Sequence, residues 1–263
     1  REVRTLMALT HSPLLVTDKL EVCIDAVNVK SYSGSGTSVI DISRHGRDAT
    51  LVNGAAINTG FDGVVSFVFD GTNDHATFST SINSVISQHK DCSFSVWVRV
   101  HDDADNTIIA HPNLTGNAPF ILWYDFEQTG TVSNTGGSDI GGGTDKVLSV
   151  MVTDSGAEFR FTTEDNVLQN MNGLLPWYNI CVVLDPSNNK FYTYVNGKLK
   201  ALFNSSSCDG IKSSSSDFDL GSGTTGGSST LNGNIALFSV YSKALSETEV
   251  IQNYNALKGR FGI

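Results

Sequence analysis

The sequence predicts an all-β protein whose chain ends in one short helix. Three observations lead to this fold class: many short apolar or alternating segments, no helical pattern between them, and a strong helix signal after residue 245. Parallel strands need crossover helices between them. The lack of helical segments in the body of the chain therefore excludes parallel βαβ units.

Strand-like segments recur along the chain, separated by turns rich in Gly, Ser, Thr and Asn. From Phe94 to Val100 every second residue is apolar, so these side chains share one strand face. Asn196-Gly197 is the strongest hairpin signal, because both residues tolerate the positive φ of a type I′ turn. The predicted strands cover residues 20–25, 49–54, 64–69, 75–78, 92–100, 107–110, 120–126, 147–153, 157–162, 178–184, 191–195, 198–203, 218–220 and 233–241.

The C-terminal helix is predicted from a capping box. Ser246 can accept a hydrogen bond from the backbone of Glu249, and the Glu249 carboxylate can reach back to the amide of Ser246. Three apolar residues then share one helical face: Val250, Tyr254 and Leu257. Gly259 is expected to end the helix in a left-handed conformation.

Composition restricts the classes of function. The 263 residues carry a net charge of −10, which repels phosphate backbones and argues against nucleic-acid binding. No apolar run approaches the length of a membrane span. The four cysteines match no zinc spacing, and three lie in apolar strand-like runs, so we expect buried reduced thiols rather than disulfides or metal ligands.

No linker or internal repeat divides the chain. Residues 1–18 lack a clear periodicity and include Pro13, so they are predicted to form an extended arm. Residues 19–263 are predicted to form a single β domain with long Gly/Ser/Thr-rich loops.

An ordered set of motifs resembles the laminin-G-like branch of the concanavalin-A-like jelly rolls. The resemblance covers residues 18–262 and is closest to versions in virion proteins of marine tailed phages. It implies two antiparallel sheets packed face to face, with binding loops at the rim or on the concave face. The motifs are Asp41-Ile-Ser, Asp48-Ala-Thr-Leu-Val-Asn-Gly54, Phe69-Asp-Gly71, Phe94-Ser-Val-Trp97, Tyr194-Val-Asn-Gly197, Gly233-Asn-Ile and Val240-Tyr-Ser-Lys-Ala-Leu-Ser246.

A calcium site is the first candidate chemistry. Asp70, Asn73 and Asp74 place two carboxylates and an amide on one turn, and such hard oxygen ligands suit Ca²⁺. Laminin-G-like domains often hold a structural calcium. Relatives often carry an acidic pair after Gly-Asn-Ile, where this chain has Ala236-Leu237. The alternative is an ordinary Asx turn whose side chains bond their own backbone.

A glycan site is the second candidate. A sugar needs an aromatic surface to stack on, together with amides or carboxylates for its hydroxyls. The candidates for this site are Trp123, Tyr124, Asp125 and Trp177. The alternative for each aromatic residue is packing, and we expect Trp97 to lie in the core.

Catalysis is the third candidate, because the wider superfamily includes glycosidases and lyases. Asp125 and Glu127 share one strand face at i, i+2, and a retaining glycosidase needs two carboxylates about 5–5.5 Å apart. The β-glucanase-like pattern E-x-D-x-x-E is absent and no triad aligns. We therefore expect a protein that is not an enzyme.

The leading hypothesis is a non-enzymatic virion surface protein, a decoration, tail or fibre component. Residues 1–18 would anchor it to other virion proteins, and its outward loops would hold host glycans. The alternatives are a free-standing extracellular carbohydrate-binding or adhesin module and a polysaccharide-cleaving enzyme. Exposed strand edges make a homo-oligomer a further possible state. Calcium is the only cofactor that the residues suggest.

Overall fold

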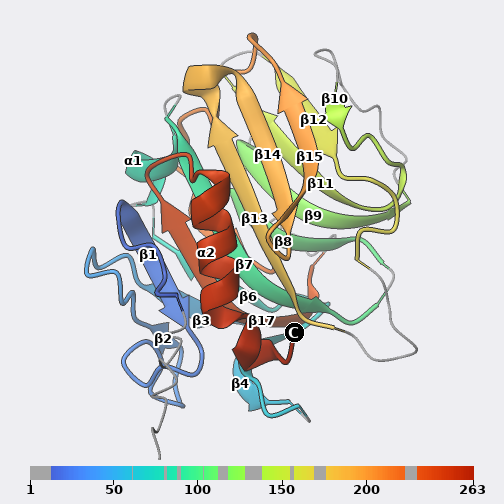
Figure 1. Ribbon diagram of the computed structural model, residues 1–263. Coiled ribbons are helices and arrows are strands. Elements are labelled where there is room, and N and C mark those ends of the chain that lie inside the picture. Colours follow the sequence, from blue (N-terminus) through green and yellow to red (C-terminus); the bar gives the residue numbers. More distant parts are fainter. Residues whose placement is uncertain are drawn as a thin grey trace, which may run out of the picture.

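The computed structural model describes residues 13–60, 62–79, 82–87, 90–102, 104–111, 118–127, 138–154, 157–168, 176–222 and 230–263. Within these ranges the strands form two antiparallel sheets, stacked face to face, with one helix of three turns near the C-terminus (Figure 1). The predicted all-β jelly-roll sandwich is therefore confirmed.

The nine-stranded sheet carries helix α2 (Glu247–Leu257) on its outer surface and is called the front sheet. Its spatial order is β10 (Ser138–Ile140), β15 (Lys198–Asn204), β14 (Lys190–Val195), β13 (Tyr178–Asp185), β7 (Cys92–Val100), β17 (Asn232–Tyr241), β5 (Val65–Asp70) and β4 (Ala56–Thr59), while β1 (Leu20–Asp25) pairs with β17. The eight-stranded back sheet runs β12 (Glu158–Thr162), β11 (Asp145–Thr153), β9 (Phe120–Glu127), β8 (Asn106–His111), β16 (Phe218–Leu220), β6 (His75–Phe78), β3 (Ala49–Val52) and β2 (Ser38–Val39).

The main core lies between the two sheets. Phe94 on β7 stacks on Phe120 of the back sheet, with ring centres 4.6 Å apart, and also on Phe218 at 5.8 Å. Phe94, Val96 and Val98 all belong to this core, and Val100 packs against it, as the alternation predicts. Burial of these large side chains is the dominant stabilising term for such a sandwich.

A second apolar layer lies between the front sheet and the C-terminal helix. Trp97 is fully buried here, stacked 3.9 Å from the ring centre of Phe261, so its predicted burial is confirmed but its place is under the helix. Val250 and Tyr254 also face this layer. Strand β7 is therefore covered on both faces, which explains why eight of its nine residues are buried, the polar Ser93, Ser95 and Arg99 among them.

Helix α2 begins as predicted, and the helical backbone after it continues past the predicted stop. The Ser246–Glu249 capping box is present in both directions. The prediction that Gly259 is the left-handed stop is wrong: the chain continues as a 3₁₀ turn, Lys258–Phe261, and the left-handed residue is Gly262. Packing of Phe261 against Trp97 keeps the chain wound for that extra turn.

The described part of the N-terminal arm packs on α2. The Val16 amide donates to Asn253 Oδ1 at 2.8 Å, and the Gln252 side chain donates to the Leu14 carbonyl at 2.8 Å. Val16 is buried with Leu245 and Val250. Residues 1–12 of the predicted arm lie outside the described residues, and the domain boundary at residue 18 stays a prediction.

Three short strands, β2, β4 and β10, and the one-turn helix α1 (Asn83–Ile86) were not predicted. All three strands lie at sheet edges, where pairing on one side lets polar or short segments join without an apolar pattern. The Asn196-Gly197 hairpin is confirmed, with φ of 50° and 72°. Among the described residues, no helix combines the length and apolarity that a bilayer crossing requires.

Candidate functional site

Trp123 and Asp125 lie together on the outer surface of the back sheet. Their i, i+2 spacing on β9 puts both side chains on one face, and β11 and β12 bring Ser149 and Arg160 alongside. Trp123 Nε1 donates to Asp125 Oδ2 at 3.1 Å, and Arg160 forms an ion pair with the same oxygen. The Arg160 guanidinium carbon lies 4.5 Å from the centre of the Trp123 ring. One ring face is thus already covered by a cation.

Asp125 is only 3% exposed. Burial raises its pKa, while the ion pair with Arg160 and the hydrogen bonds from Trp123 and Ser149 partly offset that effect. Burial likewise lowers the pKa of Arg160. Asp125 Oδ2 is engaged by three side chains of the protein itself, an arrangement typical of a structural ion pair.

Tyr124 and Trp177, the other predicted glycan residues, do not join Trp123. Tyr124 is 2% exposed and points into the core between the sheets. Trp177 is 3% exposed and packs against Phe261 in the apolar layer between the front sheet and the C-terminal helix. The four residues therefore do not form one aromatic platform.

Trp177 instead repeats the arrangement seen around Trp123. Its Nε1 donates to Asp62 Oδ2 at 2.9 Å, Arg99 forms an ion pair with that oxygen, and the Arg99 guanidinium carbon lies 4.6 Å from the Trp177 ring centre. Two Trp–Asp–Arg units of the same design thus occur: one joins β9 and β12 on the back sheet, and the other joins the loop residues Asp62 and Trp177 to β7 of the front sheet.

The predicted calcium ligands lie on the turn between β5 and β6. Asp70 Oδ1 accepts a hydrogen bond from the Thr72 amide at 2.8 Å, and Asp74 Oδ2 accepts one from the Asp70 amide at 3.2 Å. These bonds are those of the Asx-turn alternative. Within the described residues no group of three or more His, Cys, Asp or Glu side chains is placed to hold a metal ion. Calcium binding by Asp70, Asn73 and Asp74 stays a prediction.

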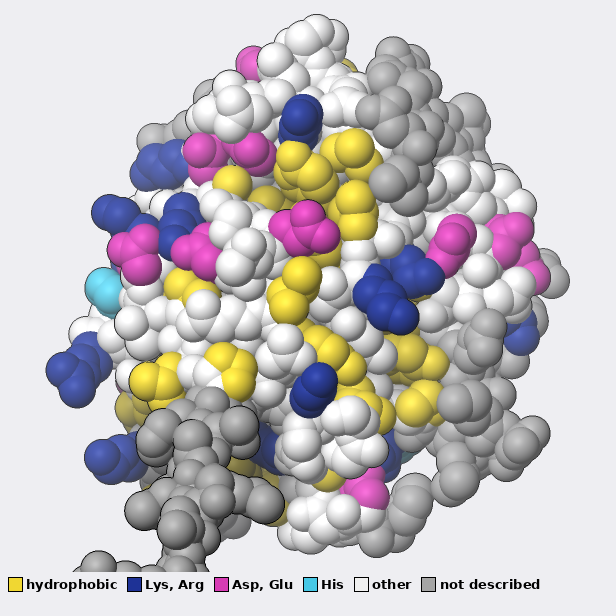
Figure 2. All heavy atoms as spheres, viewed as in Figure 1, with side chains coloured by type: hydrophobic (Ala, Val, Ile, Leu, Met, Phe, Trp, Pro, Cys, Tyr) yellow, Lys and Arg dark blue, Asp and Glu magenta, His cyan; other side chains and the backbone are white. Residues whose placement is uncertain are grey.

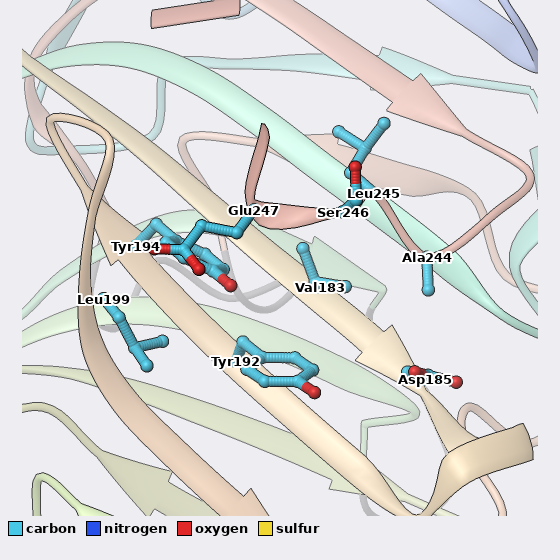
Figure 3. A pocket seen from close by; sticks show the side chains of 9 residues that line it. All are labelled: Val183, Asp185, Tyr192, Tyr194, Leu199, Ala244, Leu245, Ser246 and Glu247. Atoms are coloured by element: carbon cyan, nitrogen blue, oxygen red, sulfur yellow. The ribbon is translucent and has the colours of Figure 1, made fainter. Parts of the chain in front are cut away.

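A groove that the sequence analysis did not identify lies on the outer surface of the front sheet, beside the start of α2 (Figure 3). Its volume is about 380 Å³. Val183 on β13, Tyr192 and Tyr194 on β14 and Leu199 on β15 form the floor. The segment from Ala244 to Glu247 forms one wall. Figure 2 shows hydrophobic side chains gathered on this face.

The two tyrosine rings of the groove are stacked. Their centres are 6.1 Å apart with 28° between the planes, and Tyr192 is partly exposed while Tyr194 is 5% exposed. Burial raises the pKa of both hydroxyls, with the carboxylates of Asp185 and Glu247 adding to the effect on Tyr192 and Tyr194 respectively. Both hydroxyls therefore remain protonated hydrogen-bond donors at neutral pH.

Polar groups surround this floor. Asp185 ends β13 and is held by Asn188, whose backbone and side-chain nitrogens donate to Asp185 Oδ1 at 3.2 Å and 3.0 Å. Ser246 and Glu247 contribute the polar atoms of the opposite wall. The signal in the sequence was the Tyr-Thr-Tyr run of β14, which puts two polar-tipped rings on one strand face, but only α2 turns that face into a groove.

Comparison with solved structures gives similar folds at low sequence identity. The binding domain of Paraclostridial Mosquitocidal Protein 1 matches with a TM-score of 0.66, 16% identity, and coverage of 91% of this chain and 52% of that one. The botulinum neurotoxin serotype G binding domain matches with a TM-score of 0.62 and 17% identity, and the match covers 89% of this chain and 50% of that one. The binding domain of botulinum neurotoxin DC, in a complex with SialylT, matches with a TM-score of 0.63 and 14% identity, and the match covers 92% of this chain and 52% of that one.

The chain spans about half the length of each of these binding domains, so the similarity shows a shared sandwich fold. No curated protein matches the sequence. A family profile described as the concanavalin A-like lectin/glucanases superfamily, Laminin_G_3, matches residues 70–251, which is more than half of the chain. The protein is therefore a member of the concanavalin A-like lectin/glucanases superfamily, in its laminin-G-like group.

Proposed function

We propose that this protein is a non-enzymatic binding module that holds a saccharide in the groove beside α2. The observation that carries this proposal is the Tyr192–Tyr194 pair, a stacked aromatic floor partly open to solvent within a groove of about 380 Å³. That volume lies within the range of small-ligand sites. The lectin-like family and the binding domains of similar fold support the same class of function.

The chemistry of the groove suits a sugar ring. The apolar face of a pyranose can stack on Tyr192, while its hydroxyls donate to the carboxylates of Asp185 and Glu247. The tyrosine hydroxyls, which are protonated at neutral pH, supply donors for ring and glycosidic oxygens. An apolar floor with a hydrogen-bonding rim is what distinguishes a saccharide site from a purely apolar docking groove.

A glycan array followed by calorimetric titration of the full chain tests the site. We expect Tyr192→Ala to weaken binding of the best oligosaccharide by about 2 kcal/mol or more, because the stacking surface is removed. Trp123→Ala serves as the matched control on the other sheet and should retain binding. Circular dichroism confirms that both variants fold.

The same experiment separates this groove from the site predicted around Trp123, Tyr124, Asp125 and Trp177. If Trp123→Ala abolishes binding and Tyr192→Ala does not, the outer surface of the back sheet holds the ligand. If no oligosaccharide binds, the saccharide proposal is wrong.

The ion pair of Asp125 supports a non-enzymatic role. A retaining glycosidase needs a free nucleophile, whereas Asp125 Oδ2 already accepts hydrogen bonds from Trp123 and Ser149 and pairs with Arg160. The Glu127 side chain lies outside the described residues. Release of reducing ends from a polysaccharide, lost in Glu127→Gln, would favour the polysaccharide-cleaving alternative.

The finer proposal is that the module sits on a virion surface, anchored to other virion proteins by residues 1–18. Its support is the sequence resemblance to phage virion proteins. Residues 14–18 also stabilise α2, so deleting all of 1–18 would confuse anchoring with folding. Deleting residues 1–12 alone leaves the Val16 contacts in place.

We expect the chain lacking residues 1–12 to retain its melting temperature and to lose incorporation into particles. Particle composition is measured by quantitative mass spectrometry against the intact chain. Unchanged incorporation would contradict the anchor and leave the extracellular carbohydrate-binding or adhesin module as the better account.

A further inference from the structure

We infer that the groove selects neutral or amino-bearing saccharides and discriminates against saccharides that end in a carboxylate, such as sialic acid. This inference rests on the proposed function and assigns the ligand class of the same site. Its basis is the charge of the groove. Two carboxylates, those of Asp185 and Glu247, line it, and none of the described lining residues is Lys or Arg. The tyrosines stay neutral, so they do not offset that charge.

The two carboxylates come from different elements and lie on either side of the stacking surface. Asp185 stands at the end of β13, and Glu247 is the first residue of α2. In Figure 3 the Tyr192 ring lies between them. A ligand stacked on Tyr192 would therefore place its substituents near one carboxylate or the other, whichever way its ring is turned.

The lysine that precedes the groove wall, Lys243, is engaged by carboxylates outside the groove lining. Lys243 forms ion pairs with Asp18 and Glu249 at 2.8 Å and 2.6 Å. Lys190 is opposite Asp185 in the β13–β14 register and shares the strand face of Tyr192, so it is a cation at the Asp185 end of the groove.

The positive end of the α2 dipole is also engaged. The Glu249 side chain accepts from the Ser246 amide at 3.0 Å, and the Ser246 hydroxyl accepts from the Glu249 amide at 3.4 Å. The Glu249 and Glu247 carboxylates lie in the first helical turn and complement the dipole themselves. An incoming anion would thus meet two carboxylates at a helix end whose partial charge is already neutralised.

The test compares oligosaccharides that differ only in a terminal sialic acid, for example N-acetyllactosamine and its sialylated form on one array. A second pair compares N-acetylated with free-amine glucosamine oligomers. We expect the full chain to bind the sialylated form at least tenfold more weakly, about 1.4 kcal/mol, and to bind the amine at least as well as its acetylated form. Raising the salt concentration should reduce the difference in affinity between the neutral and the sialylated form, because salt screens the repulsion.

The variant Asp185→Asn/Glu247→Gln should remove most of the tenfold difference between the sialylated and neutral forms, whatever affinity both forms lose together from the weaker acceptors. Glu158→Gln/Asp217→Asn is the matched control, because it removes two exposed carboxylates from outside the groove and changes net charge equally. Equal or tighter binding of the sialylated form by the unmodified chain overturns the inference and leaves the saccharide site intact. A gap that closes equally in the control variant overturns it too. Failure of every saccharide to bind refutes both this inference and the proposed function.

Discussion

At the scale of single residues, two tryptophans show how context decides between binding and packing. Trp123 and Trp177 each donate to an aspartate that an arginine also pairs with, and each ring is covered by that arginine. A ring covered by a guanidinium and tied through its nitrogen has little surface left for a sugar. These residues instead join segments of the chain through ion pairs and hydrogen bonds of low exposure.

We expect Asp125→Ala to lower the free energy of unfolding by about 3 kcal/mol, because Arg160 would remain buried without its carboxylate. Urea unfolding monitored by tryptophan fluorescence measures the change. The double variant Asp125→Leu/Arg160→Met should recover most of the loss, since no charge stays buried. A loss below about 1 kcal/mol in Asp125→Ala would show that the ion pair contributes no more than an exposed one.

At the scale of elements, helix α2 organises the outer surface of the front sheet. Its apolar face covers Trp97 and Tyr194 on the outer surface of the front sheet, and its first turn forms part of the groove wall. The Lys243–Glu249 pair and the capping box fix the start of the helix. The groove therefore depends on the helix start being held in place.

Acid should weaken this helix start through Glu249. Burial alone would raise the Glu249 pKa, but hydrogen bonds from Lys243 and Ser246 outweigh it and hold the pKa below its ordinary value. The stability it contributes is therefore full above the unfolded pKa of about 4.3 and is lost as pH falls through the lower folded value. Urea unfolding of the intact chain and of Glu249→Gln between pH 7 and pH 3 measures this contribution to the free energy of unfolding.

We expect the two proteins to differ most at pH 7 and to converge in the acid range, where both lack the charge. Other carboxylates affect both proteins alike, so the difference between them isolates Glu249. A constant difference across the whole range would mean that the charge of Glu249 contributes nothing.

At the scale of the whole molecule, the sandwich needs no covalent cross-link. All four cysteines are free and buried, two in the core between the sheets and Cys181 in the layer under α2. Burial raises the pKa of Cys23 to about 11 and of Cys181 and Cys208 to about 12, and it raises the pKa of Cys92 as well. Thiolates, the reactive form, are therefore scarce in the folded protein.

We expect Ellman's reagent at pH 8 to label none of the cysteines in the folded protein and all four in denaturant. The melting temperature should be the same with and without a reductant, because no disulfide is broken. Rapid labelling of a thiol under native conditions would indicate local opening of the sandwich around that residue.

The sequence alone determined the features that depend on neighbours in the chain. Alternation set the strand from Phe94 to Val100, the Asn196-Gly197 pair set a hairpin, and Ser246 with Glu249 set the helix start. Each signal is local, because residues within about four positions decide it. The ordered motifs then identified the superfamily, which the profile match confirms.

The tertiary structure decided everything that depends on distant segments meeting. Trp123 and Trp177 are 54 positions apart, and only the tertiary fold places Trp123 on the back sheet and Trp177 beside the front sheet, each next to an arginine from a distant part of the chain. The groove needs Tyr192 from β14 and Glu247 from α2, which meet because the helix folds back across the front sheet. Local patterns state which face of a strand a side chain occupies, but the partner on that face is set by packing across the whole molecule.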